Sequence, residues 1–333
     1  MAYQGNLYGD ITTRVGVVAV AKFLAHAQNE MFLEQYAMQE MIPQNKGQTL
    51  KWKRAIPLQV SAVALTEGVT KAPKMYEDEP VQVSISQYGE WMGLTDVIAD
   101  THEDPVLNKM TEVLGQQAGA TKELIIWNAI SAGTQVIYTN GTARIDVNTP
   151  ITSDDLRAAV RQLKLNRGKK ITKRIPASTD IATEPVNAGY VYFGNTAQQR
   201  DNEEMAGFVP CYQDAGYSPL SEWEIGSVAN GEVRVVLTNH AVPDYGAGSA
   251  TLNGMLNNVS NVDVYLGVLF AQDAFGAASL KGRNAATISV VNPKVTVEDP
   301  HGQRGIVSWK FWYAALILNQ NWIIRIEAAC TDL

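Results

Sequence analysis

The most regular spacing of apolar residues lies in residues 105–133 and predicts one long helix. Apolar side chains recur there every three or four positions, which is the spacing of one helix face. Asp104 suits the N-cap, Pro105 suits the first helical position, and Gly133 ends the run. About 28 helical residues at about 1.5 Å rise would form a rod of roughly 40 Å, more than twice the mean helix length. The expected buried face consists of Leu107, Met110, Leu114, Ala118 and Ile125.

A second, shorter helix is predicted for the segment TSDDLRAAVRQLKLNRGKK, residues 152–170. Thr152 or Ser153 can cap it, and acids in its first turn and bases in its last turn complement the helix dipole. Gly168 stands just past the end, where a glycine in the left-handed conformation commonly closes a helix. The expected apolar stripe consists of Leu156, Val160 and Leu163.

Two segments nearer the N-terminus alternate between apolar and polar residues, which predicts strands with one polar face. They are residues 49–58 and residues 80–94, with about twenty residues of Gly, Pro and charge between them. That gap is too long for a tight turn, so we expect a long two-stranded arm with an irregular tip. A lone ribbon is marginally stable in water and has open edges. The arm therefore has to lie on its own domain or on a neighbouring subunit, and the pattern leaves that choice open.

The N-terminal apolar segment, residues 14–27, has two interpretations. An apolar run ending at a small-x-small site is typical of a secretory signal, but Lys22 interrupts this run and no Lys or Arg precedes Arg14. The helical spacing of apolar residues instead extends to Met41, and Pro43 then stops the helix. We therefore predict an N-terminal helical arm.

After the second helix the chain changes to short apolar runs between Gly-, Asn- and Pro-rich turns, which predicts strands. The final stretch, residues 299–329, is the most aromatic part. Its cleanest apolar run, residues 311–318, is too short for a membrane-spanning helix, which needs about 20 residues. Aromatic and β-branched residues on both sides of Asn319-Gln320-Asn321 instead predict two strands of a core sheet joined by a tight turn.

Composition narrows the class of protein. The chain has 333 residues, enough for a large core and for about two domains. Its charged fraction of 18% lies below the roughly 25% usual in soluble domains, which is compatible with surface buried between subunits. The net charge of −7 argues against a general nucleic-acid binder. Cys211 and Cys330 lie far apart, so we expect reduced thiols rather than a disulfide framework or a zinc site.

Two clusters carry candidate chemistry. One cluster consists of Asp96, Asp100, His102, Glu103 and Asp104, and it could form a metal site. The favoured interpretation is that these acids precede the long helix and interact with the positive end of its dipole. That interpretation also explains Pro105. The stretch KLNRGKKITKR, residues 164–174, could contact phosphate, but a solvated helix end and loop is favoured. The chain contains no GxGxxG, P-loop, GxSxG or HExxH motif. We expect no catalytic, cofactor-binding or metal-binding residues.

Three stretches resemble one protein family. Residues 222–241, EWEIGSVANGEVRVVLTNHA, are similar to a glutamate-isoleucine-glycine segment followed by an arginine-bearing strand. Residues 265–282, YLGVLFAQDAFGAASLKG, are similar to a glycine–alanine–aromatic segment, and residues 299–327 are similar to the family's closing strands. With the order of elements, these stretches make the chain resemble the major capsid proteins of tailed bacteriophages, in the N-four-like group. At Asn195-Thr196 the chain departs from the family, which has a His-Pro pair there.

The resemblance implies an α+β fold of the Hong Kong 97 type. The implied parts are an N-terminal arm (1–45), an extended loop that reaches over a neighbouring subunit (46–98), a peripheral domain with the long spine helix and the following helix (99–185), a β-rich axial domain (186–275) and a return to the peripheral sheet (276–333).

The resemblance also implies a structural protein, not an enzyme, that self-assembles into pentamers and hexamers of an icosahedral shell around double-stranded DNA. The expected location is the virion capsid, after assembly in the host bacterial cytoplasm. The expected partners are the portal, scaffolding or decoration proteins, and packaged DNA through non-specific contact, with no membrane. Two alternatives are an encapsulin-like compartment shell and a soluble metal-dependent enzyme built on the cluster at residues 96–104.

Overall fold

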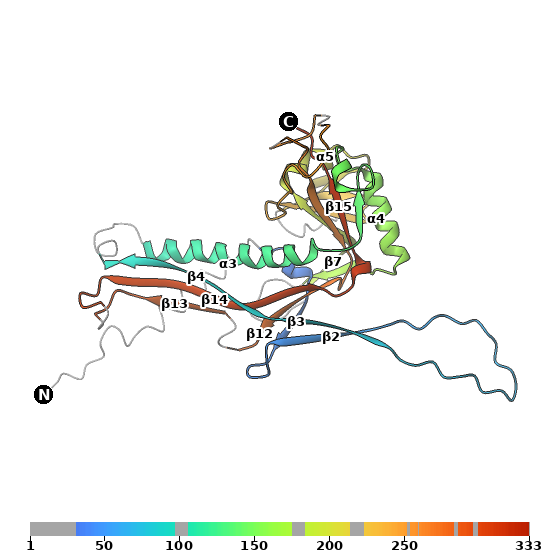
Figure 1. The fold of residues 1–333 in the computed structure, drawn as a ribbon, viewed down its shortest axis with the longest axis horizontal. Helices are drawn as coiled ribbons and strands as arrows, with labels where there is room; N and C mark the ends of the chain where they lie inside the picture. The colour runs from blue at the N-terminus through green and yellow to red at the C-terminus, as the bar shows by residue number, and fades with distance from the viewer. Residues whose placement is uncertain are drawn as a thin grey trace.

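The computed structural model describes residues 31–96, 106–174, 184–213, 223–251, 254–258, 260–282, 286–295 and 299–332. They form an elongated sheet with helix α3 (Val106–Ile130) along it, a second β-rich body with helix α4 (Ser153–Leu165) on its outside, and a projecting hairpin (Figure 1). Among the helices of these residues, none is long and apolar enough to cross a membrane.

Five strands form the elongated sheet, in the order β1-β12-β14-β13 with β4 paired to β14. Their bounds are Met38–Ile42 (β1), Ser86–Thr95 (β4), Phe275–Leu280 (β12), Ala286–Val291 (β13) and Arg304–Ile317 (β14). The 14-residue strand β14 is long enough to pair along one edge with β4 and along the other with β13 and then β12. This single strand therefore holds the sheet together.

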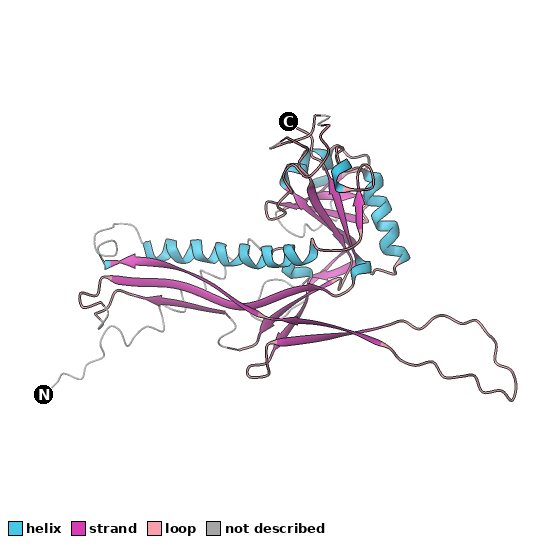
Figure 2. Ribbon diagram, in the orientation of Figure 1, coloured by secondary structure: helices cyan, strands magenta, loops and turns pink. Residues whose placement is uncertain are grey.

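Helix α3 lies along one face of this sheet and confirms the predicted long helix (Figure 2). The predicted buried face is confirmed at three positions, Met110, Leu114 and Ala118. Nearer the C-terminus, Ile125 is only half-buried. Trp127 is buried in its place, at the junction of the two bodies, where its ring lies 5.5 Å from that of Phe193.

Alternation along β14 sends one set of apolar side chains toward α3 and the others to the opposite face. The set toward α3 is buried and consists of Val307, Trp309, Phe311 and Tyr313. The rings of Trp309 and Phe311 stack with centroids 4.9 Å apart, and Trp309 Nε1 donates to Gln117 Oε1 on α3 at 3.3 Å. Trp312 faces the other way and is half-buried in the cluster that contains Trp52. The aromatic stretch thus joins sheet and helix in one core.

The second body contains an eight-stranded sheet in the order β5-β15-β11-β7-β10-β9-β8, with β6 also paired to β7. The bounds are Val136–Tyr138 (β5), Ile171–Arg174 (β6), Glu184–Asn195 (β7), Val209–Pro210 (β8), Glu224–Val228 (β9), Val233–Thr238 (β10), Tyr265–Phe270 (β11) and Ile323–Ala328 (β15). Every residue of β10 and β11 is buried. Both strands are therefore covered on two faces, which explains their continuous apolar runs.

Helix α4 confirms the second predicted helix. The Thr152 side chain accepts a hydrogen bond from the backbone N–H of Asp155, and the Asp155 carboxylate accepts one from the backbone N–H of Thr152. This reciprocal pair is a capping box. The predicted stripe of Leu156, Val160 and Leu163 is buried. One detail of the C-terminus is wrong: Arg167, not Gly168, has the left-handed conformation, with φ 57°. Gly168 instead packs closely, since a Cβ there would lie 3.2 Å from that of Ala271.

The two predicted closing strands exist, but the expectation that they lie in one sheet is wrong. The 3-10 turn η6 (Gln320–Trp322) sends β15 into the eight-stranded sheet, where Ile324 faces Leu269 of β11. Five of the six residues of β15 are buried. A strand buried on both faces fits the interior of that sheet, whereas β14 stays beneath α3.

The predicted helix through Met41 is also wrong where the structure describes it. Residues 31–42 form the 3-10 turn η2 (Leu33–Tyr36) and strand β1, which runs parallel to β12. The sheet edge offers β1 a full row of backbone hydrogen bonds, and this tertiary pairing overrides the helical spacing. The remainder of the predicted helical arm, residues 1–30, lies outside the described residues.

The projecting hairpin confirms the predicted two-stranded arm in its first part. Strands β2 (Thr49–Ala55) and β3 (Asp78–Ser84) are antiparallel, and residues 56–77 connect them. The second predicted strand does not continue along the arm, however. At the buried residue Ile85 it breaks, and its second part becomes β4, which pairs with β14 in the elongated sheet.

Candidate subunit-contact surfaces

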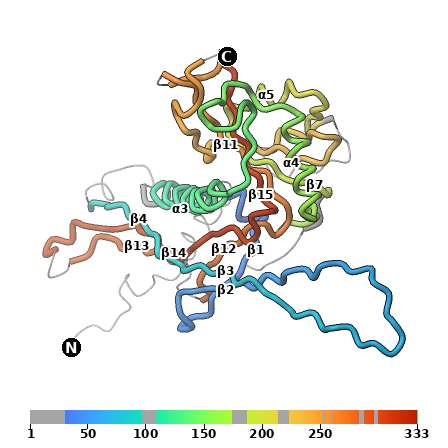
Figure 3. Tube along the Cα trace, turned by 45° about the vertical axis from the view of Figure 1, so that its right-hand side comes forward, coloured from blue at the N-terminus to red at the C-terminus, as the bar shows by residue number. Residues whose placement is uncertain are grey.

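The connection between β2 and β3 is the most exposed apolar segment of the described chain. Val60 and Leu65 are each 80% exposed and Met75 is 84% exposed, and the other exposed apolar residues here are Ile56, Leu58, Val63, Val69 and Tyr76. The segment projects away from both bodies (Figure 3). Contiguous exposed apolar surface of this kind marks an interaction site.

The same segment has internal order. Ile56 N donates to Glu77 O at 3.0 Å at its base, and Val69 N donates to Thr66 O at 3.2 Å across the turn at its tip. Between these ends, the Nζ of Lys71 donates to Ser61 Oγ at 3.1 Å. These bonds join the two sides of the loop at its base, in its middle and at its tip.

The base of the hairpin is anchored on the elongated sheet. Trp52 is only 6% exposed and packs in a cluster with Ile42, Ile85, Ala278 and Ala314. A Cβ on Gly276 of β12 would lie 3.2 Å from the Trp52 ring, so only a glycine lets the indole settle there without displacing a neighbour. The hairpin is thus held at its base and uncovered at its tip.

The segment near residue 32 is held in the core by α3 of the same chain. The carboxylate of Glu123 on α3 is fully buried and accepts the backbone N–H of Phe32 at 3.2 Å. It also accepts the N–H of Leu33, at 3.0 and 3.1 Å. Beside it, Lys122 Nζ lies 5.7 Å from the Phe311 ring centroid and 3.5 Å from Glu34 Oε1. Spine helix, sheet and N-terminal segment meet at this point.

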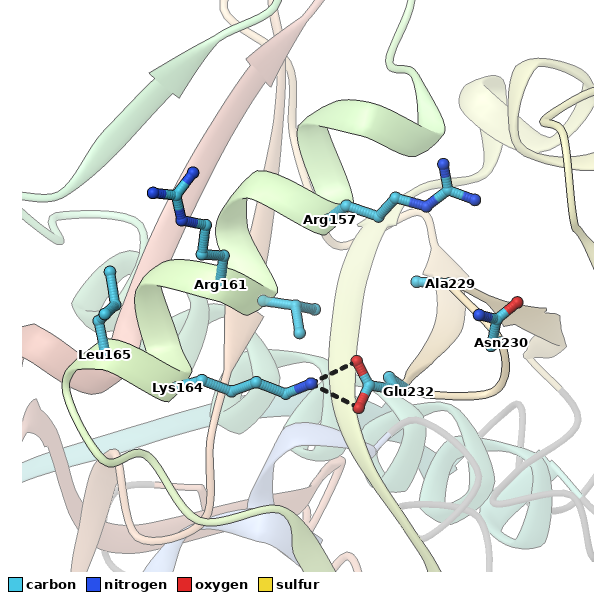
Figure 4. A pocket seen from close by; sticks show the side chains of 8 residues that line it. Arg157, Arg161, Lys164, Leu165, Ala229, Asn230 and Glu232 are labelled. Carbon is cyan, nitrogen blue, oxygen red and sulfur yellow. Dashed lines mark hydrogen bonds and ion pairs between the residues drawn. The ribbon is translucent and has the colours of Figure 1, made fainter.

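A groove of about 530 Å³ lies between α4 and the turn that joins β9 to β10 (Figure 4). Arg157 and Lys164 reach from α4 toward that turn, while the Arg161 guanidinium points away from Glu232. Lys164 Nζ binds both Glu232 oxygens, at 2.6 and 2.7 Å, and Lys170 binds one at 3.0 Å. These two lysines lower the pKa of Glu232 below its ordinary value.

The contacts in this groove test part of the interpretation of the basic stretch at residues 164–174. Lys164 and Lys170, two of its six bases, are held by Glu232 of the same chain. This favours the interpretation of a helix end and loop over a phosphate site for those two. The structure does not test phosphate contact by the others, and that part stays a prediction.

The predicted metal cluster lies almost wholly outside the described residues. Only Asp96 is described, and its backbone N–H donates to Gln303 O at 3.2 Å. The helix N-terminus at Asp104 and Pro105, on which the favoured interpretation depends, is outside as well. Within the described part of the chain, no group of three or more His, Cys, Asp or Glu residues could hold a metal ion.

Sequence reasoning missed two ion pairs of the second body, one buried and one partly buried. Arg234 on β10 and Glu224 on β9 are 3% and 0% exposed at the side chain, and two hydrogen bonds of 2.7 and 3.0 Å join them. Arg144 binds the fully buried Glu327 at 2.6 and 2.7 Å. The Glu-Ile-Gly segment followed by an arginine-bearing strand was the visible signal for the first pair. The second pair spans 183 residues and had no signal in the sequence.

Both cysteines are free thiols, as predicted. Burial raises the pKa of Cys211 to about 11 and that of Cys330 to about 12. Both thiols are therefore protonated at neutral pH.

Comparison with known proteins gives the fold a class. No family model matches the chain. The solved capsid of Ralstonia phage GP4 superimposes with a TM-score of 0.66 at 11% identity, covering 91% of this chain and 92% of that one. The head structure of Helicobacter pylori bacteriophage KHP40 has a TM-score of 0.59 at 11% identity over 88% and 87% of the two chains. The capsid of cyanophage Pam1 has a TM-score of 0.57 at 10% identity over 99% and 96%.

The chain therefore has the α+β fold of tailed-phage capsid proteins, the Hong Kong 97 type, as predicted. In sequence it is similar to the major capsid protein of Pseudomonas phage KPP21, with 22% identity over 264 residues. That match covers 73% of this chain and 66%, just under two thirds, of the relative's length. The N-four-like group named from the sequence stays a prediction.

Proposed function

We propose that this chain is a major capsid subunit that self-assembles into the icosahedral shell around the double-stranded DNA of a tailed phage. The observation that supports the proposal is the projecting hairpin on a capsid-type fold, because its apolar residues are exposed, with no cover from the described residues, and its base is packed on the elongated sheet. Neighbouring subunits in a closed shell would supply that cover. The role is structural, and we assign the chain no catalytic residue, cofactor or metal.

The proposed division into parts follows the family. Residues 1–45 form the arm, 46–98 the extended loop, 99–185 the peripheral domain, 186–275 the axial domain and 276–333 the return to the peripheral sheet. In this proposed division, β4 of the extended loop pairs in the elongated sheet, while β15 of the last part and α4 of the peripheral domain pack in the body of the eight-stranded sheet.

The proposed partners are other copies of the chain in pentamers and hexamers, the portal, and scaffolding or decoration proteins. Packaged DNA would meet the inner surface through non-specific contact, which a net charge of −7 keeps weak. Assembly would take place in the host cytoplasm without a membrane, and the finished protein would lie in the virion capsid.

Electron microscopy of the concentrated protein, or of virions, tests the proposal directly. The expected result is closed shells or capsomers of five and six, and virions whose shell contains this chain and DNA. Shells that enclose a cargo protein and no DNA would instead indicate an encapsulin-like compartment. A monomer by light scattering across a wide concentration range, with the hairpin ordered, would overturn the proposal, and bound metal in the pure protein would revive the enzyme alternative.

A further inference from the structure

A small cavity lies at the base of the projecting hairpin, beside the turn that joins β14 to β15. Its volume is about 140 Å³, below the roughly 300–1,000 Å³ of pockets for drug-sized ligands. The hairpin contributes Trp52 to its wall, and the turn contributes Asn319 and Trp322. Met38 and Leu318 add apolar surface. The cavity therefore suits a ligand of about the size of one amino-acid side chain, with an apolar part.

Two hydrogen-bond donors in this wall have no acceptor among the described residues. The side chain of Trp52 is buried, with the residue 6% exposed, and its Nε1 has no partner. Asn319 is 7% exposed, and its Oδ1 accepts the backbone N–H of Asn321 at 3.1 Å. That bond orients the carboxamide, so the NH2 group of Asn319 is the part left to donate. Buried polar groups are nearly always hydrogen-bonded, so we expect an acceptor from outside the chain.

The charges around the cavity favour a ligand without negative charge. Lys53 lies 3.4 Å from Asp78, and Arg54 binds Glu79, so both cations of the wall are already paired. Asp273 also lines the cavity, is exposed, and has no hydrogen bond or ion pair with a described residue. Its carboxylate accepts hydrogen bonds and repels an anion. The unpaired charge of the wall is thus negative, and it favours a ligand that donates a hydrogen bond there.

We propose that this cavity binds a neutral carboxamide group on a small apolar body. A carboxamide combines a carbonyl oxygen, which accepts hydrogen bonds, with an NH2 group that donates them. The carbonyl oxygen would accept from Trp52 Nε1 and Asn319 Nδ2, and the NH2 group would donate to Asp273. A free small amide and a glutamine side chain of another protein share this chemistry. The inference goes beyond the proposed function, because such binding is a property of the single folded subunit.

Binding to the unassembled subunit tests the proposal with matched pairs of probes. Isobutyramide and isobutyrate have nearly the same shape, and the acid lacks the NH2 group and carries a negative charge. The methylamides of acetyl-glutamine and acetyl-glutamate form the same pair for a protein side chain. Ligand-detected NMR titrations at neutral pH measure each dissociation constant.

The amides are expected to bind in roughly the millimolar range, because they have few atoms, and the carboxylates about tenfold more weakly or not at all. Binding of isobutyramide would show that the site takes a free amide. Binding of the capped glutamine alone would assign the site to a side chain of a partner protein. Either result supports the proposal.

Three variants test the assigned hydrogen bonds, and thermal melting checks that each one folds. W52F keeps a ring without the N–H, and N319D keeps the oxygen that Asn321 uses without the NH2. Each should weaken amide binding by roughly three- to tenfold. D273N suits the φ of 57° at this position, since Asn adopts it readily, and should let isobutyrate bind about as well as isobutyramide. W91F is the control, because Trp91 is 62% exposed on β4 outside the cavity, and it should bind like the parent.

Parent subunits that bind neither amide would show that the cavity holds only water and would overturn the proposal. Equal binding of amide and carboxylate by the parent would overturn it too, as would unchanged amide affinity in W52F and N319D. If those two variants do not fold, D273N decides, because its exposed side chain has no described contact to lose. An undiminished preference of D273N for the amide would then overturn the proposal. None of these results depends on assembly, so the proposed function is tested separately.

Discussion

The carboxylate of Glu123 holds the backbone N–H of Leu33, 90 positions earlier in the chain, at 3.0 and 3.1 Å. The same carboxylate takes the N–H of Phe32. These bonds tie the start of the described chain to the C-terminal half of helix α3. They also complete the backbone hydrogen bonding of a buried 3-10 turn, whose first N–H groups would otherwise have no partner.

Replacing Glu123 by Leu is expected to destabilise the subunit and release the N-terminal segment. Hydrogen bonds to a charged group contribute about 1.5–3 kcal/mol each, and their loss leaves buried N–H donors unsatisfied. Urea unfolding and limited proteolysis around residue 31 measure the two effects. The matched control is Asn128→Ala on the exposed side of the same helix, which should change neither. Wild-type stability and protection in E123L would show that the carboxylate does not hold the segment.

Phe311→Ala is expected to impair folding of the subunit, whereas Trp312→Ala is expected to impair its assembly. Phe311 is 4% exposed beneath α3, and truncating a buried aromatic costs about 3–5 kcal/mol, so this variant should give misfolded, aggregated subunits. Trp312 is half-buried on the other face, beside the base of the hairpin, and its variant should give folded subunits that assemble poorly. Soluble yield and melting temperature, followed by assembly, separate the two outcomes. If both variants melt and assemble like the parent, the packing of β14 is not what holds the subunit and its hairpin.

Neutralising Lys169, Lys170 and Lys173 to Gln is expected to leave the packaged genome unchanged. Lys170 already pairs with Glu232, and the chain has a net charge of −7, so these bases are not expected to drive packaging. The loss of the partly exposed pair should change stability by no more than about 1 kcal/mol. DNA content per shell is the measurement, and shell yield is its control. A large loss of DNA from shells that still form would assign these lysines a role in packaging.

The contact between α4 and the β9–β10 turn should weaken in acid. Lys164 and Lys170 lower the pKa of Glu232 in the folded chain. A lowered folded-state pKa means that the stabilisation is fully present above the ordinary value of 4.5 and is lost as the pH falls through the lowered value. The melting temperature of E232Q should therefore lie below that of the parent at neutral pH, and the two should converge as the pH falls below 4.5. E67Q, which alters no described contact, should melt like the parent throughout, and a gap for E232Q that persists in acid would contradict the ion-pair explanation.

The sequence by itself determined the elements whose signals are local. Helix α4 has its cap, its acids and its stripe within thirteen residues, and the spine helix shows a regular apolar face over most of its length. The hairpin strands β2 and β3 alternate, and the long gap between them predicted the irregular loop. These signals survive in the tertiary structure because capping, dipole and face periodicity act within one element.

The tertiary structure decided what depends on partners far away along the chain. The segment at Met38 has helical spacing but becomes a strand because the edge of β12 is open to it. The closing strands look like one hairpin in the sequence, yet β15 pairs with β11 in the eight-stranded sheet, where five of its six residues are buried. The pairs Glu123–Leu33 and Arg144–Glu327 join residues 90 and 183 positions apart. Buried charges and backbone N–H groups need a partner wherever the fold brings one, and no local pattern in the sequence says which residue that will be.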